Sequence, residues 1–86
     1  MTSYRAKFSE ERRGRAVRLI DDVAIKGTVF PRKGPIIVDG QYTLYFNSDL
    51  ELEEIRRKLY KIDLDAECHY FNGVTMQSYL NGDAGF

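Results

Sequence analysis

The chain has 86 residues, of which 43% are hydrophobic and 30% charged, and its 13 basic residues balance its 13 acidic ones. These proportions are those of an ordinary globular domain and exclude a disordered chain, and no apolar run approaches the roughly 18 residues that a membrane span requires. The N-terminus lacks the apolar region of a secretory signal, and the single cysteine, Cys68, has no disulfide partner within the chain. We therefore expect a cytoplasmic protein without membrane association, with one domain over residues 1–80 and a loose tail over 81–86.

The charges are divided unevenly along the chain. Residues 1–34 carry nine Lys and Arg against four acids, whereas residues 35–86 carry four against nine. The acids that have no local counterpart are scattered, but the bases cluster in Arg12–Arg18 and at Arg32 and Lys33. Such asymmetry is informative about partners rather than about fold. The basic segment is therefore the first candidate for a binding surface.

The first predicted element is a strand. Tyr4, Ala6 and Phe8 alternate with Arg5 and Lys7, and this period of two is typical of a half-buried strand with one side in water.

The segment that follows fits two interpretations. The β-branched residues favour a hairpin of strands over 15–20 and 23–30. The alternative is a second helix over about 10–25, with Ser9 as its cap and Gly27 after its end. Gly14 would cost such a helix about 1 kcal/mol. We favour the hairpin and keep the helix as the alternative.

A clear turn and hairpin come next. Residues 31–35 read Pro-Arg-Lys-Gly-Pro, a combination typical of a turn. Residues 36–38 and 41–46 then predict two strands joined at Asp39-Gly40, because this dipeptide suits a type I′ turn.

The strongest predicted element is an amphipathic helix over about 48–62. Ser48 and Glu51 have the spacing of a capping box. Apolar residues then recur with the period of one helix face: Leu52, Ile55, Leu59 and Ile62.

A last hairpin is predicted from residues 66–71 and 74–80, joined at Asn72-Gly73. The whole pattern indicates an α+β domain with a small antiparallel sheet of about five to seven short strands, either open or closed into a partly open barrel.

Few residues in this chain are of the types that support catalysis or metal binding. Cys68 and His69 are the only residues of their kinds, but neighbouring strand residues point to opposite faces of a sheet, so we expect no nucleophilic dyad. Asp63, Asp65 and Glu67 alternate and could offer oxygen ligands to a cation, although we prefer a solvated acidic edge. The expectation is a protein that is not an enzyme and that has no metal and no cofactor.

Arginines and tyrosines are the residues enriched at interface hot spots. We therefore expect a small intracellular binding module, an adaptor or inhibitor that docks on another protein, similar in size and character to accessory proteins of phages and plasmids. The candidate partner-binding residues are the basic segment and the sheet tyrosines: Arg12, Arg13, Arg15, Arg18, Arg32, Lys33, Tyr45, Tyr70 and Tyr79.

Two other functions fit the same residues. Nucleic-acid binding would use the arginines of 12–18 and the 31–35 turn to neutralise phosphates. Self-association would bring the basic part of one copy to the acidic part of the next, in a contact that closes into a ring or extends as a filament.

Overall fold

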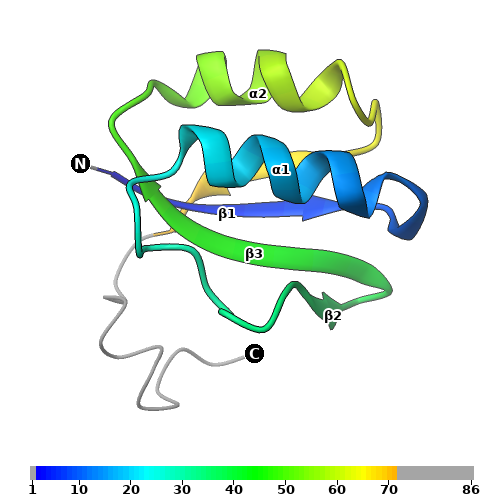
Figure 1. The fold of residues 1–86 in the computed structure, drawn as a ribbon. Helices are drawn as coiled ribbons and strands as arrows, with labels where there is room; N and C mark the ends of the chain where they lie inside the picture. The colour runs from blue at the N-terminus through cyan, green and yellow to red at the C-terminus, as the bar shows by residue number, and fades with distance from the viewer. Residues whose placement is uncertain (1, 72–86) are drawn as a thin grey trace.

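The computed structural model describes residues 2–71. Two helices lie side by side on one face of a sheet (Figure 1). In chain order the elements are β1 (Thr2–Phe8), a 3-10 turn (Glu10–Arg12), α1 (Arg13–Val23), β2 (Ile36–Val38), β3 (Gln41–Ser48), α2 (Leu52–Tyr60) and β4 (Glu67–Tyr70). All strand pairs are antiparallel and the order across the sheet is β2-β3-β1-β4. This β-α-β-β-α-β sequence of elements is the split β-α-β, or ferredoxin-like, motif.

The α+β class with an antiparallel sheet is confirmed. Within residues 2–71 the sheet has four strands and is open, so the expectation of five to seven strands or a barrel is not confirmed. The predicted strand over 74–80 and the predicted tail over 81–86 lie outside the described residues. None of the helices in the described part is long and apolar enough to cross a bilayer.

The preferred hairpin over 15–30 is wrong, and the alternative helix is right. Residues 13–23 form α1, which buries Ala16 and Ile20 against the sheet and packs Val17 and Val23 on the same core. Burial of this apolar face outweighs the strand preference of the β-branched residues, which is weak and depends on context. Residues 24–35 form a loop that contacts β3 through a β-bridge between Phe30 and Tyr45 and through hydrogen bonds of Ile25 and Thr28 with Asn47.

The predicted hairpin at Asp39-Gly40 is confirmed. It joins β2 to β3, and both turn residues have positive φ, 52° at Asp39 and 79° at Gly40. Positive φ at both positions is what a type I′ turn requires.

Helix α2 is shorter than the predicted 48–62, and the predicted capping box is wrong. Ser48 is the last residue of β3, and Glu51 is the N-cap without a side-chain bond. The Ser48 hydroxyl donates to the Val23 carbonyl at 2.7 Å and accepts from the Leu50 N–H at 3.1 Å. The Ser48 hydroxyl therefore links the last residue of α1 to the segment that precedes α2 and does not cap a helix.

The core lies between the helices and the sheet. On β1 the alternating residues Tyr4, Ala6 and Phe8 are buried, as predicted. The register places Ala6 beside Leu44 of β3 and beside Cys68 of β4. Helix α2 adds its predicted apolar face, of which Leu52, Ile55 and Leu59 are buried.

Asp63 joins the turn that follows α2 to the turn that precedes α1. Only 7% of it is exposed, and its carboxylate accepts from the Ser9 N–H at 2.8 Å and the Asp65 N–H at 3.0 Å. Burial alone would raise the pKa of Asp63, but the hydrogen bonds from Ser9 and Asp65 and the nearby Arg12 guanidinium lower it. The expectation of a solvated acidic edge is therefore wrong for Asp63.

Candidate functional site

A groove runs between α1 and the loop of residues 24–35. It consists of two adjoining hollows of about 570 and 520 Å³, which share Val17 and Gly34 in their lining. Both volumes lie within the roughly 300–1,000 Å³ of typical ligand sites. We call this surface the basic groove. Its apolar floor consists of Val17, Ala24, Ile25, Val29, Pro31 and Leu44, and its cationic rim of Arg13, Arg18, Lys26, Arg32 and Lys33.

Residues from three parts of the chain meet in the floor. Val17 is on the side of α1 that faces the loop, Ala24 directly follows the helix, and Leu44 of β3 lines the same hollow as both. The loop turns back at its far end, where the Gly34 N–H donates to the Pro31 carbonyl at 3.2 Å. Gly34 has a φ of 111°, which a residue with a Cβ rarely adopts.

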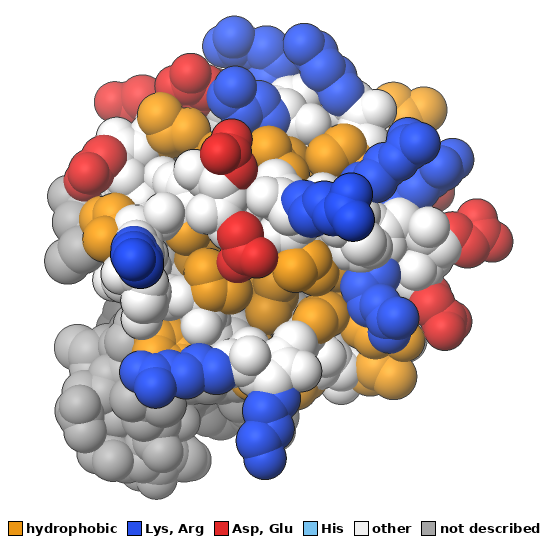
Figure 2. All heavy atoms as spheres, viewed as in Figure 1, with side chains coloured by type: hydrophobic (Ala, Val, Ile, Leu, Met, Phe, Trp, Pro, Cys, Tyr) orange, Lys and Arg blue, Asp and Glu red, His pale blue; other side chains and the backbone are white. Residues whose placement is uncertain are grey.

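The rim is strongly positive. All five cations are exposed, and Asp21 is the one acid among the lining residues of the two hollows. In Figure 2, hydrophobic side chains occupy the middle of this face together with acidic ones, and Lys and Arg side chains surround them. The ion pairs seen within residues 2–71 join Glu53 to Arg56 and His69 to Glu67, so no rim cation is neutralised by an acid of the described part.

Two of the rim cations lie against aromatic rings. The Arg13 guanidinium carbon is 5.3 Å from the centre of the Tyr42 ring, and that of Arg32 is 5.4 Å from the centre of the Phe30 ring. Tyr42 in turn stacks on the buried Phe8, with ring centres 6.4 Å apart. Cation–π contacts of this kind stabilise by about 0.5–1 kcal/mol at exposed sites and favour the position of the guanidinium over the ring.

The structure brings together four of the six predicted basic residues. Arg13, Arg18, Arg32 and Lys33 line the basic groove. Arg12 instead lines a separate hollow that also includes Asp63, and Arg15 is exposed on α1 and lines neither hollow of the groove.

Sequence reasoning missed Lys26 and the apolar floor. The predicted strand and turn contain Ile25, Val29 and Pro31, so the apolar character of these residues did not point to a surface. Apolar residues grouped in a loop that follows an amphipathic helix are the sequence signal that could have indicated the groove.

Of the sheet tyrosines named as candidates, Tyr45 and Tyr70 lie on different surfaces of the protein. Tyr45 is 5% exposed and packs edge-on against Phe71 at 4.5 Å. Tyr70 is 52% exposed and stacks on Tyr4 at 5.6 Å. The register pairs Tyr45 with Arg5 and Tyr70 with Tyr4, so the two tyrosines point to opposite faces of the sheet. Tyr79 lies outside the described residues.

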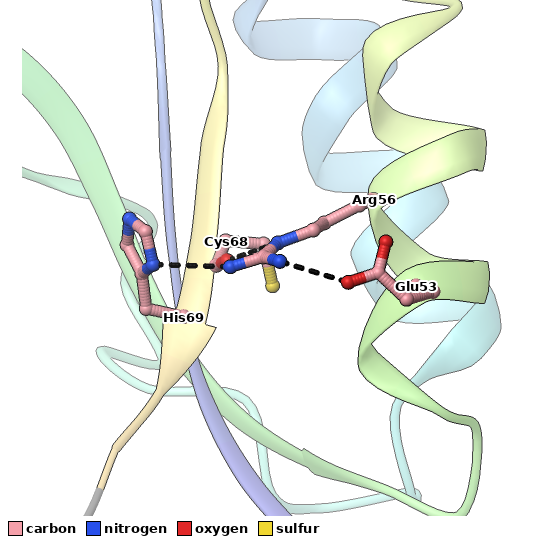
Figure 3. Close-up of polar contacts among 4 residues, drawn as sticks. All are labelled: Glu53, Arg56, Cys68 and His69. Atoms are coloured by element: carbon pink, nitrogen blue, oxygen red, sulfur yellow. Dashed lines mark hydrogen bonds and ion pairs between the residues drawn. The ribbon is translucent and has the colours of Figure 1, made fainter.

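The cysteine and the histidine diverge, as predicted. In Figure 3, Arg56 of α2 reaches the strand that holds both residues. Its guanidinium donates to the Cys68 carbonyl at 2.9 Å, lies 3.2 Å from His69 Nδ1, and donates to Glu53 at 2.9 Å. Cys68 is buried and His69 is exposed. Burial raises the pKa of the Cys68 thiol to about 12, although Arg56 opposes the shift, so the thiol stays protonated at neutral pH.

The groove is thus the most distinctive surface of the described part of the chain. Residues 2–71 hold no group of three or more His, Cys, Asp or Glu that could bind a metal ion. An aliphatic floor between cations suits a ligand that carries both apolar groups and negative charge. No protein-family model, curated protein or solved structure matches this chain.

Proposed function

We propose that this protein is a small non-enzymatic binding module, an adaptor or inhibitor, that docks an acidic segment of another protein in its basic groove. The observation that carries the proposal is the combination of an apolar floor with five exposed rim cations. Burial of the floor supplies binding free energy, and the cations select and steer an acidic partner. The free and buried Cys68 fits action in a reducing cytoplasm.

The groove favours an acidic protein over a nucleic acid. Proteins that bind single strands stack bases on exposed aromatic rings, whereas the floor of the groove is aliphatic. Tyr42 and Phe30, the rings that Arg13 and Arg32 contact, line neither hollow of the groove. Bases would therefore find no stacking platform here, while leucine-like side chains would find an apolar surface.

Charge reversal tests the proposal. A variant with Arg18→Glu and Lys33→Glu changes the rim of the groove, and a matched control with Arg15→Glu and Arg57→Glu reverses two exposed charges elsewhere. Affinity capture from lysate, with and without nuclease treatment, identifies acidic partners, which are then purified for direct binding measurements. We expect the groove variant to lose binding and the control to retain it.

Two results would contradict the proposal. The first is equal binding by the groove variant and the control. The second is capture that disappears with nuclease treatment while a labelled oligonucleotide binds the wild type, which would support nucleic-acid binding instead.

A further inference from the structure

We infer that the basic groove selects a peptide segment in which two acidic residues flank an apolar stretch, with Arg13 and Arg32 as the two carboxylate anchors. This inference rests on the proposed function and specifies the partner's chemistry at the same surface.

The two arginines occupy different parts of the groove. Arg32 lines one hollow and Arg13 the other, and the hollows meet at Val17 and Gly34. Most of the apolar floor lies in the hollow of Arg32, and the hollow of Arg13 adjoins that floor at Val17. A segment that lays apolar side chains on this floor and continues past Val17 into the second hollow can place one acidic residue at Arg32 and another at Arg13.

Each arginine lies against an aromatic ring that is itself packed on the rest of the protein. Arg13 lies over Tyr42, which stacks on buried Phe8. Arg32 lies over Phe30, which is 4% exposed and exchanges two 2.7 Å backbone hydrogen bonds with Tyr45. A ring against one face of a guanidinium leaves its N–H edge available for a bidentate bond to a carboxylate. An ordered side chain also loses less conformational entropy on binding.

The rest of the rim explains why the acids belong at the ends of the segment. Asp21 lies one helical turn after Val17, beside the junction of the hollows. A carboxylate in the middle of the bound segment would meet Asp21, and like charges brought together at an interface disfavour binding. The middle of the segment is therefore apolar and its flanks are acidic.

Selection from a library of random displayed peptides tests this inference before any natural partner has been identified. The wild type serves as bait, and the variant with Arg18→Glu and Lys33→Glu serves as counter-selection. We expect the enriched peptides to share an apolar stretch with acidic residues on both sides. Neutralising either flank of a synthetic representative should weaken binding by about 2- to 5-fold, as expected for the loss of one ion pair to an exposed arginine.

Two conservative substitutions then test the anchors. Arg13→Lys keeps the charge but loses the planar fork over Tyr42, and Tyr42→Leu keeps Arg13 but removes its ring. Each should weaken the representative peptide about 5-fold, and the double variant should be little worse than either, because both remove the same held guanidinium. Arg15→Lys, outside the groove, should leave affinity unchanged, and circular dichroism checks that the Tyr42 variant is folded.

The outcomes separate the inference from the proposed function. Enriched acidic peptides without the flanking pattern, or equal effects of Arg13→Lys and Arg15→Lys, would overturn the inference and leave the docking function standing. Enrichment no greater on the wild type than on the counter-selection variant would overturn both.

Discussion

Asp63→Asn should destabilise the fold. The size of the effect depends on the hydrogen bonds that the Asp63 carboxylate accepts. The Asp63 carboxylate accepts two backbone N–H bonds, from Ser9 at 2.8 Å and from Asp65 at 3.0 Å. An asparagine offers one acceptor oxygen and turns an NH₂ group toward the other donor. Hydrogen bonds to charged groups contribute about 1.5–3 kcal/mol each, so the loss of one lowers the free energy of unfolding by about that amount.

Urea and thermal unfolding measure this loss. For a domain of this size, about 1.5–3 kcal/mol corresponds to a fall in Tm of roughly 6–24 °C. Asp65→Asn is the matched control, because the Asp65 side chain is exposed and only its backbone N–H reaches Asp63. The control should stay within about 0.5 kcal/mol of the wild type.

The same interaction predicts a dependence on pH. Folding lowers the pKa of Asp63, so its stabilisation is present above the unfolded pKa of about 3.9 and is lost as pH falls through the lowered folded value. The difference in stability between wild type and Asp63→Asn should therefore be constant near neutral pH and shrink under acid conditions. An Asp63→Asn variant as stable as the Asp65→Asn control would refute the reasoning.

Two further predictions concern backbone conformation and thiol reactivity. Gly14→Ala should stabilise the protein by about 0.5–1 kcal/mol, because Gly14 lies within α1 and an added Cβ would meet open space. Gly34→Ala should instead destabilise it by about 1 kcal/mol or more, because its φ is 111°; urea unfolding compares the two, and equal effects would contradict the account. Cys68, whose pKa burial raises to about 12, should react with iodoacetamide at pH 8 only after unfolding, and mass spectrometry that finds rapid labelling of the native protein would contradict its burial.

Elements with a strong local signal could be predicted from the sequence. The hairpin at Asp39-Gly40 could be predicted because this dipeptide favours the two positive φ angles that a type I′ turn requires. The apolar spacing of Leu52, Ile55 and Leu59 likewise identifies α2. The predicted start of α2 at Ser48 is wrong, because the Ser48 hydroxyl donates a long-range hydrogen bond to the Val23 carbonyl instead of capping the helix.

Helix α1 and the groove depend on contacts between distant residues. The β-branched side chains of α1 favour a strand locally, and only the burial of Ala16 and Ile20 against the sheet decides for the helix. The floor of the groove joins Val17 to Leu44, which are far apart in sequence. The clustered bases could therefore be identified as candidates from the sequence, but the apolar surface between them could not.

The most direct test of the docking groove is NMR chemical-shift mapping of the labelled protein with a purified acidic partner segment. The account predicts that shift changes concentrate at Val17, Ala24, Gly34 and the neighbouring lining residues, and that they weaken as salt rises. Changes concentrated instead at the Arg12 and Asp63 hollow, or around His69 on the sheet, would contradict the assignment of the basic groove as the binding surface.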